Sequence, residues 1–142
     1  MDEINLLSEW THLGEVENIQ GVDKPGLYLL AHFDKSPESS RARLSDNIVY
    51  IGETTRQTIG VRLYQFAQSA FKRKIGHSGG WTYSDVFLSS QHIDSVPDNL
   101  YVSILPVDRE EKESKAYIKY VERLLIWEYF KEHGDYPRCN TA

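Results

Sequence analysis

The chain has 142 residues, of which 40% are hydrophobic, 26% are charged and 12% are aromatic. This balance is typical of a globular protein and excludes a disordered or fibrous chain. The length predicts a single core, and no apolar run approaches the roughly 20 residues that cross a bilayer. The first ten residues, MDEINLLSEW, lack the basic start and long apolar stretch of a signal peptide, so we expect a cytoplasmic protein with no membrane contact.

Cysteine and histidine argue against a zinc protein. Cys139 is the only cysteine, which excludes an intrachain disulfide and a thiolate cage for zinc. The five histidines are scattered without the spacing of a helical metal site. A zinc enzyme is therefore not expected.

The net charge of −5 is unevenly distributed along the chain. Residues 1–23 hold six acidic residues and no lysine or arginine, whereas residues 41–77 hold seven basic residues and two acidic ones. Such asymmetry is found in acidic proteins that present one polyanion-binding face. Incidental clustering on a solvated surface is the alternative from charge alone.

The first half of the chain predicts a helix followed by two strands. Residues 3–12 carry apolar side chains that fit a short helix, so residues 1–24 are expected to form an acidic N-terminal helical arm. Residues 27–33 form a nearly continuous apolar run, typical of a buried strand, and residues 34–46 read as a polar loop. A second strand covers residues 48–51 and is expected to stop at Gly52. Two strands joined by a loop predict an antiparallel pair.

The second half predicts a helix, a loop, a strand and a long helix. A helix begins after Thr54 or Thr55 as cap, and its apolar residues recur on one face from Ile59 to Phe71. The glycines of GHSGG predict a loop containing His77, and residues 82–90 fit either a helix or an extended segment. Residues 100–107 predict a strand with Pro106 at an edge or end, and residues 109–133 predict a long helix. The fold class is therefore α/β in its α+β form: a small three-stranded antiparallel sheet flanked by helices.

Two short motifs accompany the two predicted strands: Gly26-Leu27-Tyr28 with the first and Tyr50-Ile51-Gly52 with the second. Together with an arginine on the following helix, a glutamate on the long helix and a terminal asparagine, this order resembles the GIY-YIG nuclease superfamily. The resemblance extends over residues 25 to 140 and implies a nuclease domain at 25–142. It implies a catalytic set that consists of Tyr28, Tyr50, Arg62, Glu122 and Asn140.

Phosphodiester cleavage needs a base for the attacking water and cations for the phosphate oxygens, and the residue types match these needs. A tyrosine with an ordinary pKa near 10 is a poor base unless nearby positive charge favours the phenolate, and Arg62 is expected to supply such charge. Arg62 falls on the rim of its helix, where a guanidinium can bind phosphate in a bidentate manner. Gly52 is expected to let the backbone turn sharply and approach the substrate.

Glu122 is the expected metal ligand, for Mg²⁺ or Mn²⁺. Its helical neighbours Ile118, Leu125 and Ile126 are apolar, and a charge in such surroundings needs a partner. A single carboxylate with water and phosphate oxygens suits Mg²⁺. The alternative is a surface ion pair with Lys119.

Further contacts and other functions complete the predictions. The residues expected to bind nucleic acid are Arg56, Lys72, Arg73 and His77. The sequence predicts a metal-dependent endonuclease that acts on DNA, with specificity supplied by loops, a protein partner or homo-oligomerisation. The alternatives are a non-catalytic module of the same fold that binds nucleic acid or protein, and an unrelated small-molecule enzyme with a closed apolar pocket. DNA and RNA are not distinguished at this stage.

Overall fold

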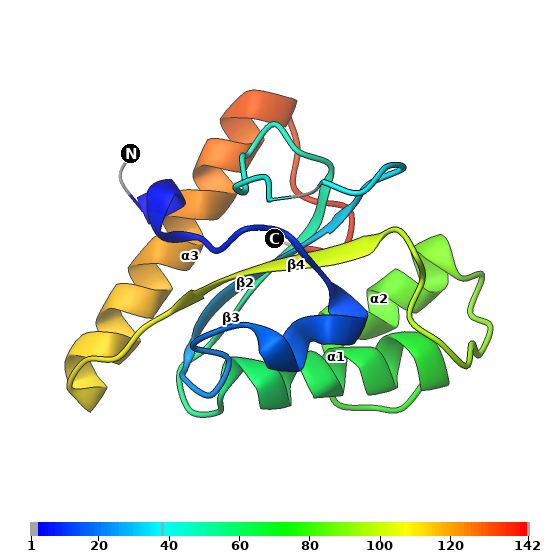
Figure 1. The fold of residues 1–142 in the computed structure, drawn as a ribbon, viewed down its shortest axis with the longest axis horizontal. Helices are drawn as coiled ribbons and strands as arrows, with labels where there is room; N and C mark the ends of the chain where they lie inside the picture. Colours follow the sequence, from blue (N-terminus) through cyan, green and yellow to red (C-terminus); the bar gives the residue numbers. More distant parts are fainter. Residues whose placement is uncertain (1–2, 38, 142) are drawn as a thin grey trace.

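A computed structural model describes residues 3–37 and 39–141 and divides them into strands, helices and two short 3₁₀ segments. In chain order the elements are η1 (Glu3–Leu6), β1 (Thr11–His12), η2 (Leu13–Asn18), β2 (Gly26–His32), β3 (Ile48–Thr54), α1 (Ile59–Lys72), α2 (Ser78–Phe87), β4 (Leu100–Pro106) and α3 (Glu111–His133). The chain is thus a mixed α+β protein with an antiparallel sheet flanked by helices (Figure 1). Among the described residues, no helix combines the length and apolar character needed to cross a membrane.

In the part of the chain that the structure describes, the sheet has four strands, where the sequence predicted three. Their order is β1-β4-β2-β3, and every neighbouring pair is antiparallel. The extra strand comes from the segment predicted as a helix: only Glu3–Leu6 turns, as a 3₁₀ helix, and Thr11–His12 then pairs with β4. The extended chain wins here because it gains tertiary hydrogen bonds, from Ser8 N to Ile104 O at 2.8 Å and from Trp10 N to Ser40 O at 3.0 Å.

Helices cover both faces of the sheet, with α3 on one face and α1 with α2 on the other (Figure 1). Side chains of β2 alternate between the two layers: Leu27, Leu29 and Ala31 pack with the α3 side, whereas Tyr28 and Leu30 pack with the α1 side. Burial on both faces explains the unbroken apolar run of this strand.

The register of the β2–β3 pair places the two signature tyrosines on one face, and a bulge follows directly after Tyr50 opposes Leu30. Leu30 opposes Tyr50 but Ala31 opposes Ile48, which leaves Val49 as the extra residue. Tyr28 directly opposes Gly52. The predicted strand end at Gly52 is wrong, because β3 continues to Thr54 with Gly52 as an interior residue. The antiparallel pairing is confirmed.

Two helix boundaries differ from the sequence prediction. Helix α1 is capped by Thr58, whose hydroxyl accepts from Val61 N at 3.1 Å, rather than by Thr54 or Thr55. His77 is not in a loop but is the N-cap of α2, with Gly79 and Gly80 inside the helix. Alanine-sized groups at these two glycines would collide with α1 and with Tyr50, so tertiary packing keeps a helix where composition disfavours one.

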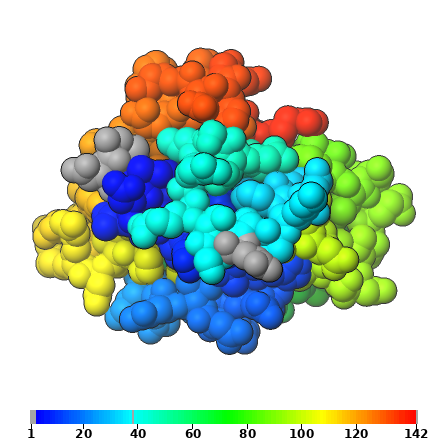
Figure 2. Space-filling model, turned by 45° about the horizontal axis from the view of Figure 1, so that its top comes forward, coloured from blue at the N-terminus to red at the C-terminus, as the bar shows by residue number. Residues whose placement is uncertain are grey.

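The N-terminal segment and the loop before β3 lie side by side on one surface of the molecule (Figure 2, blue and cyan). Glu9 pairs with Arg41 in an isolated bridge, and the Trp10 indole donates to the Asp46 carboxylate at 2.8 Å. Trp10 and Leu7 are buried in the core layer between the sheet and α3. The segment before residue 25 therefore contributes to the same core and sheet as the rest of the chain.

Candidate functional site

The two signature tyrosines pack over Gly52. Their ring centroids are 6.0 Å apart, and a Cβ on Gly52 would lie 2.5 Å from both Tyr28 Cζ and Tyr50 Cε2. A residue with a side chain would force one or both rings to move. Gly52 is therefore required for the close approach of two phenols, rather than for the sharp turn expected from the sequence.

His77 is fixed against Tyr28 by three hydrogen bonds. Its backbone N–H donates to Ser69 Oγ at 3.0 Å, its Nδ1 accepts from Gly80 N at 3.1 Å, and its Nε2 lies 2.8 Å from the Tyr28 hydroxyl. Burial, and then the Arg62 charge, lower the pKa of His77 to about 3, so the ring is neutral near pH 7. Because Nδ1 accepts, the proton of the neutral ring is on Nε2 and is donated to the Tyr28 oxygen.

The same bonds place His77 inside the site rather than on the surface. The side chain is 2% exposed and also packs against the Tyr50 ring at 5.5 Å. Ser69, Gly79 and Gly80 hold it there, and sequence reasoning missed all three. Position 79 needs glycine, because a Cβ there would lie 2.5 Å from the Tyr50 ring.

Both phenols are protonated near neutral pH in the free protein. Burial is the main cause: it raises the pKa of Tyr28 well above 10 and that of Tyr50 to about 12. The Arg62 guanidinium lowers the pKa of both groups without offsetting burial. Tyr28 is 1% exposed whereas Tyr50 is half-buried, so Tyr50 is the phenol that faces solvent.

Arg62 projects from α1 toward the tyrosines, as its helical position predicted. It is half-buried, and its Nη1 donates to Gln65 Oε1 at 2.7 Å and to Gly76 O at 2.9 Å. Its charge acts on Tyr28, Tyr50 and His77 together. The guanidinium thus provides positive charge beside two hydroxyl groups, which is a suitable place for a phosphate oxygen.

Glu122 lies on α3, which covers the face of the sheet opposite to the tyrosines, yet its charge acts on Tyr50. The carboxylate is half-buried on α3, and its charge raises the pKa of Tyr50. Burial and then the neighbouring Glu53 carboxylate raise the pKa of Glu122 itself. The closest ion pair of Lys119 is with Glu53, at 3.1 Å, and the Lys119 charge also lowers the pKa of Glu122 against the effects of burial and Glu53.

Glu53 is an acidic residue of the site that the sequence did not single out. It follows Gly52 on β3, and strand alternation directs it to the α3 face, where it meets Lys119. Its side chain is 17% exposed, and its Oε2 is buried without a hydrogen-bond partner. The available signal was an acid one residue after Tyr-Ile-Gly, within a strand.

The two carboxylates fit a hard divalent cation. Glu53 offers a buried, unpartnered oxygen, and Glu122 is destabilised in its charged form by that same neighbour. A cation between them would relieve both effects, and Mg²⁺ often binds one or two carboxylates while retaining water. Within the described ranges, no group of three or more His, Cys, Asp or Glu side chains is placed to hold a metal.

Asn140 joins the C-terminal segment to the edge strand beside Tyr50. Its amide oxygen accepts from Ile51 N and its amide nitrogen donates to Ile51 O, both at 2.9 Å. Cys139 N bonds to Val49 O at 2.8 Å, so the segment follows the outer edge of β3. Asn140 thus holds the backbone next to Tyr50, and its amide is engaged with that backbone.

Two of the three surface cations named from the sequence are engaged in ion pairs. Lys72 pairs with Asp94 at 3.2 Å, and Arg73 pairs with Asp85 at 2.5 Å, both near the end of α1. Arg56 is exposed just after β3. The structure thus brings Tyr28, Tyr50, Arg62 and His77 together on one face of the sheet, with Glu122 acting on Tyr50 through its charge, whereas Lys72 and Arg73 are held in ion pairs.

These observations define the class of site: a cluster of phenols, a guanidinium and carboxylates around the edge strand of a mixed α+β domain. Comparison with known proteins gives no match, whether to a protein-family model, to a curated protein or to a solved structure. The GIY-YIG resemblance therefore stays a prediction from the sequence motifs.

Proposed function

We propose that this protein is a divalent-metal-dependent endonuclease that hydrolyses phosphodiester bonds in DNA, with a GIY-YIG type of active site. The observation that carries the proposal is the packing of Tyr50 against the Tyr28 and His77 rings, at centroid distances of 6.0 and 5.5 Å, in a position where the charges of Arg62 and Glu122 act on its hydroxyl. These residues come from β2, β3, α1, the start of α2 and α3, which are separated in sequence. Their convergence is what a phosphodiesterase site requires.

Arg62 binds the non-bridging oxygens of the scissile phosphate. The guanidinium is already held by Gln65 and Gly76, so it is oriented before the substrate arrives. Preorganised positive charge at the position where negative charge develops stabilises the transition state without reorganisation. Asn140 supports this geometry by fixing the backbone on one side of Tyr50.

Tyr50 is the general base in this proposal. Its hydroxyl is more accessible than that of Tyr28, and its oxygen accepts the proton of the attacking water once the phenol is ionised. Tyr28 holds the neighbouring position: it receives the hydrogen bond from His77 and packs against the Tyr50 ring. Its own hydroxyl proton is then free to donate toward Tyr50 or the phosphate.

Glu122, with Glu53, would hold the metal ion. Bound Mg²⁺ or Mn²⁺ supplies positive charge that polarises the phosphate and favours ionised oxygen nearby. Glu53 is suited to this role by its unpartnered buried oxygen, and Lys119 partly neutralises the pair in the free protein. Burial of Glu122 between Ile118, Leu125 and Ile126 limits the water around its carboxylate.

The test is nicking of supercoiled plasmid by purified protein with Mg²⁺, with Mn²⁺ and with EDTA. Glu122→Gln and Arg62→Ala should each reduce nicking by about 100-fold or more. Glu128→Gln is the matched control on α3, because Glu128 pairs with Lys131 at 3.0 Å and has no part in the cluster. Metal-independent nicking, or equal activity of the Glu122 and Glu128 variants, would refute the proposal.

A second candidate is a non-catalytic binding module of the same fold. It is favoured by the burial of both phenols, which holds them protonated at neutral pH and makes them donors rather than bases. Such a module would bind DNA without nicking it in any metal. Its affinity for DNA would fall in Arg62→Ala but would be unchanged or increased in Glu122→Gln, since that change removes negative charge.

A further inference from the structure

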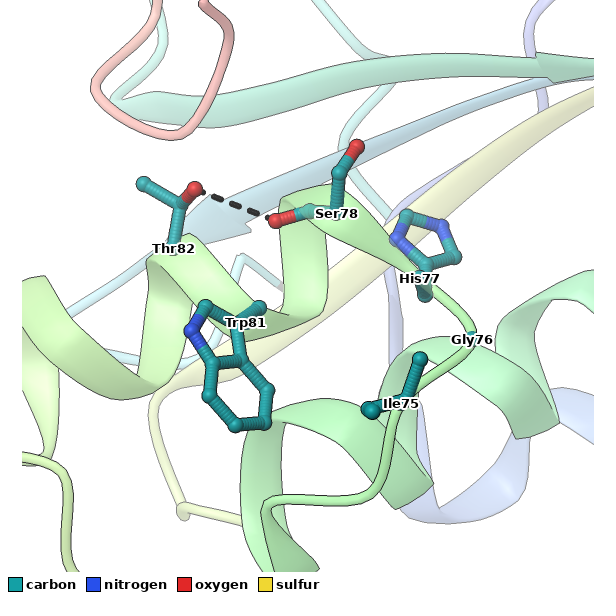
Figure 3. Close-up of a pocket in the computed structure, with 6 residues that line it drawn as sticks. All are labelled: Ile75, Gly76, His77, Ser78, Trp81 and Thr82. Atoms are coloured by element: carbon teal, nitrogen blue, oxygen red, sulfur yellow. Dashed lines mark hydrogen bonds between the residues drawn. The ribbon is translucent and has the colours of Figure 1, made fainter.

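The turn between α1 and α2 forms an open hollow next to the tyrosine cluster. It is lined by Ile75, Gly76, His77, Ser78, Trp81 and Thr82 and has a volume of about 440 Å³ (Figure 3). This size falls within the range of small-ligand sites. Two large apolar side chains stand at its opening: Ile75 is 96% exposed and Trp81 is 37% exposed. Figure 3 shows them flanking the open space from the loop and from α2.

The hollow shares its inner wall with the proposed catalytic cluster. Gly76 O receives the Arg62 guanidinium at 2.9 Å, and His77 donates to Tyr28 at 2.8 Å. A phosphate held by Arg62 therefore lies near the inner side of the hollow. The base of the same or the adjacent nucleotide would then be directed toward Trp81.

Trp81 is held in place as an aromatic platform. The Arg73 guanidinium lies 3.8 Å from the ring centroid, and Arg73 is itself held by Asp85. The remaining exposed part of the indole lines the hollow. An aromatic ring fixed in this way loses little conformational freedom when a flat ligand stacks on it.

The charge around the hollow suits a polyanion. Lys74 is exposed immediately before Ile75, and Arg62 lies behind Gly76. The Thr82 hydroxyl is engaged with Ser78 O at 3.1 Å, so this polar group is not free to read a base edge. An apolar slot with an aromatic wall and cationic surroundings binds bases by stacking, with little preference among them.

We propose that this hollow binds one unstacked nucleobase next to the scissile phosphate, with Trp81 stacking on the base and Ile75 acting as a wedge that separates it from its neighbour. This inference rests on the proposed function, since it places a nucleic acid at Arg62. The hollow then selects for single-stranded, frayed or distorted DNA, because unstacking a base in a regular duplex costs free energy.

The experiment measures binding of a fluorescein-labelled 12-nucleotide single strand in EDTA, where no metal-dependent cleavage occurs. The Trp127→Phe variant serves as the parent protein for fluorescence. It removes the exposed tryptophan of α3, and Trp10 is buried, so a ligand that quenches tryptophan emission from the surface acts on Trp81. In this background, addition of unlabelled strand should quench Trp81 emission. The additional change Trp81→Phe should abolish the quenching and keep affinity within about threefold, since an aromatic ring remains.

Two further variants measure the contribution to affinity by anisotropy. Trp81→Ala should weaken binding by roughly 5- to 100-fold. Ile75→Ser should weaken it by several-fold and leave the melting temperature unchanged, because the side chain is almost fully exposed. Trp127→Ala is the matched control and should bind like the wild type. Wild-type affinity in both Trp81→Ala and Ile75→Ser would overturn the base site, as would quenching that persists without Trp81.

Plasmid nicking is read separately, so that the two proposals can fail independently. Quenching of Trp81 emission by the strand, with no nicking in any metal, would support the base site and refute the nuclease. Nicking with Mg²⁺, together with wild-type affinity in both Trp81→Ala and Ile75→Ser, would refute the base site alone. Absence of any oligonucleotide binding would refute the base site. Binding of an added acidic protein to this chain, in place of the oligonucleotide, would indicate a protein partner.

Discussion

Gly79 and Gly60 occupy the same position, the second residue, in α2 and α1, and they offer a matched test of how Tyr50 is held. Alanine at either site brings the same gain in helix propensity, at most about 1 kcal/mol. The surroundings differ. A Cβ at Gly60 would meet Val22 Cγ2 at 3.3 Å, whereas a Cβ at Gly79 would meet Tyr50 Cε1 at 2.5 Å.

The Gly79→Ala methyl group must displace the Tyr50 ring by about 0.9 Å to restore ordinary contact at 3.4 Å. Overpacking of this kind destabilises by about 1–3 kcal/mol, and a displacement near 1 Å lowers activity by about 100-fold. Gly60→Ala should change the free energy of unfolding by less than about 1 kcal/mol and leave nicking unchanged.

Urea titration gives the free energy of unfolding, and plasmid nicking gives the activity. Equal stability and equal nicking in the Gly79→Ala and Gly60→Ala variants would show that Tyr50 is not confined by α2. Loss of stability with full activity would show that the position of Tyr50 does not limit the reaction. Either result would refute the role assigned to this phenol.

Other expectations concern pH and metal. The pKa of Glu122 is raised in the folded protein, so its contribution to stability is complete at low pH and is lost as pH rises. Glu122→Gln should therefore raise the melting temperature of the metal-free protein at pH 8 by a few degrees. A lower melting temperature would contradict this reasoning. The pKa of His77 is lowered to about 3, so the free energy of unfolding should fall as pH drops below 6.5. Asparagine can still cap α2, so His77→Asn should make the free energy of unfolding from urea titrations less dependent on pH in this range. If Tyr50 acts as the phenolate, kcat/KM should rise about tenfold per pH unit from pH 6 to 9, and a flat profile would exclude it as the base. Glu53→Gln should weaken Mg²⁺ binding, measured by calorimetry without substrate, by roughly 10- to 100-fold, and unchanged affinity would remove Glu53 from the metal site.

Local patterns were sufficient for most of the regular elements. The apolar run of β2 and the helical spacing of α1 predicted both elements, and Gly134 marked the end of α3 as expected. These patterns reflect burial periodicity and capping, which are written into neighbouring residues. The paired strands followed from the same patterns and from the loop that joins them.

The misassigned segments are those where distant partners decide the backbone. The GHSGG stretch looks like a loop because glycine disfavours helices, yet α2 begins at Ser78, since only glycine lets it approach Tyr50 and α1. Residues 3–12 look helical, yet the hydrogen bonds of Ser8 and Trp10 to residues far along the chain favour extended structure. Propensity is overridden where tertiary contacts contribute more free energy.

By itself the sequence determined the chemical inventory and its order: two tyrosines on neighbouring strands, an arginine on the next helix and a glutamate in an apolar stretch of the last one. Only the tertiary structure decided that Glu53 joins Glu122, that Lys119 pairs with Glu53, and that His77 bonds to Tyr28. The reason is physical: side-chain type is a local property, whereas charge coupling and hydrogen bonding depend on distances that the packing of separate elements sets.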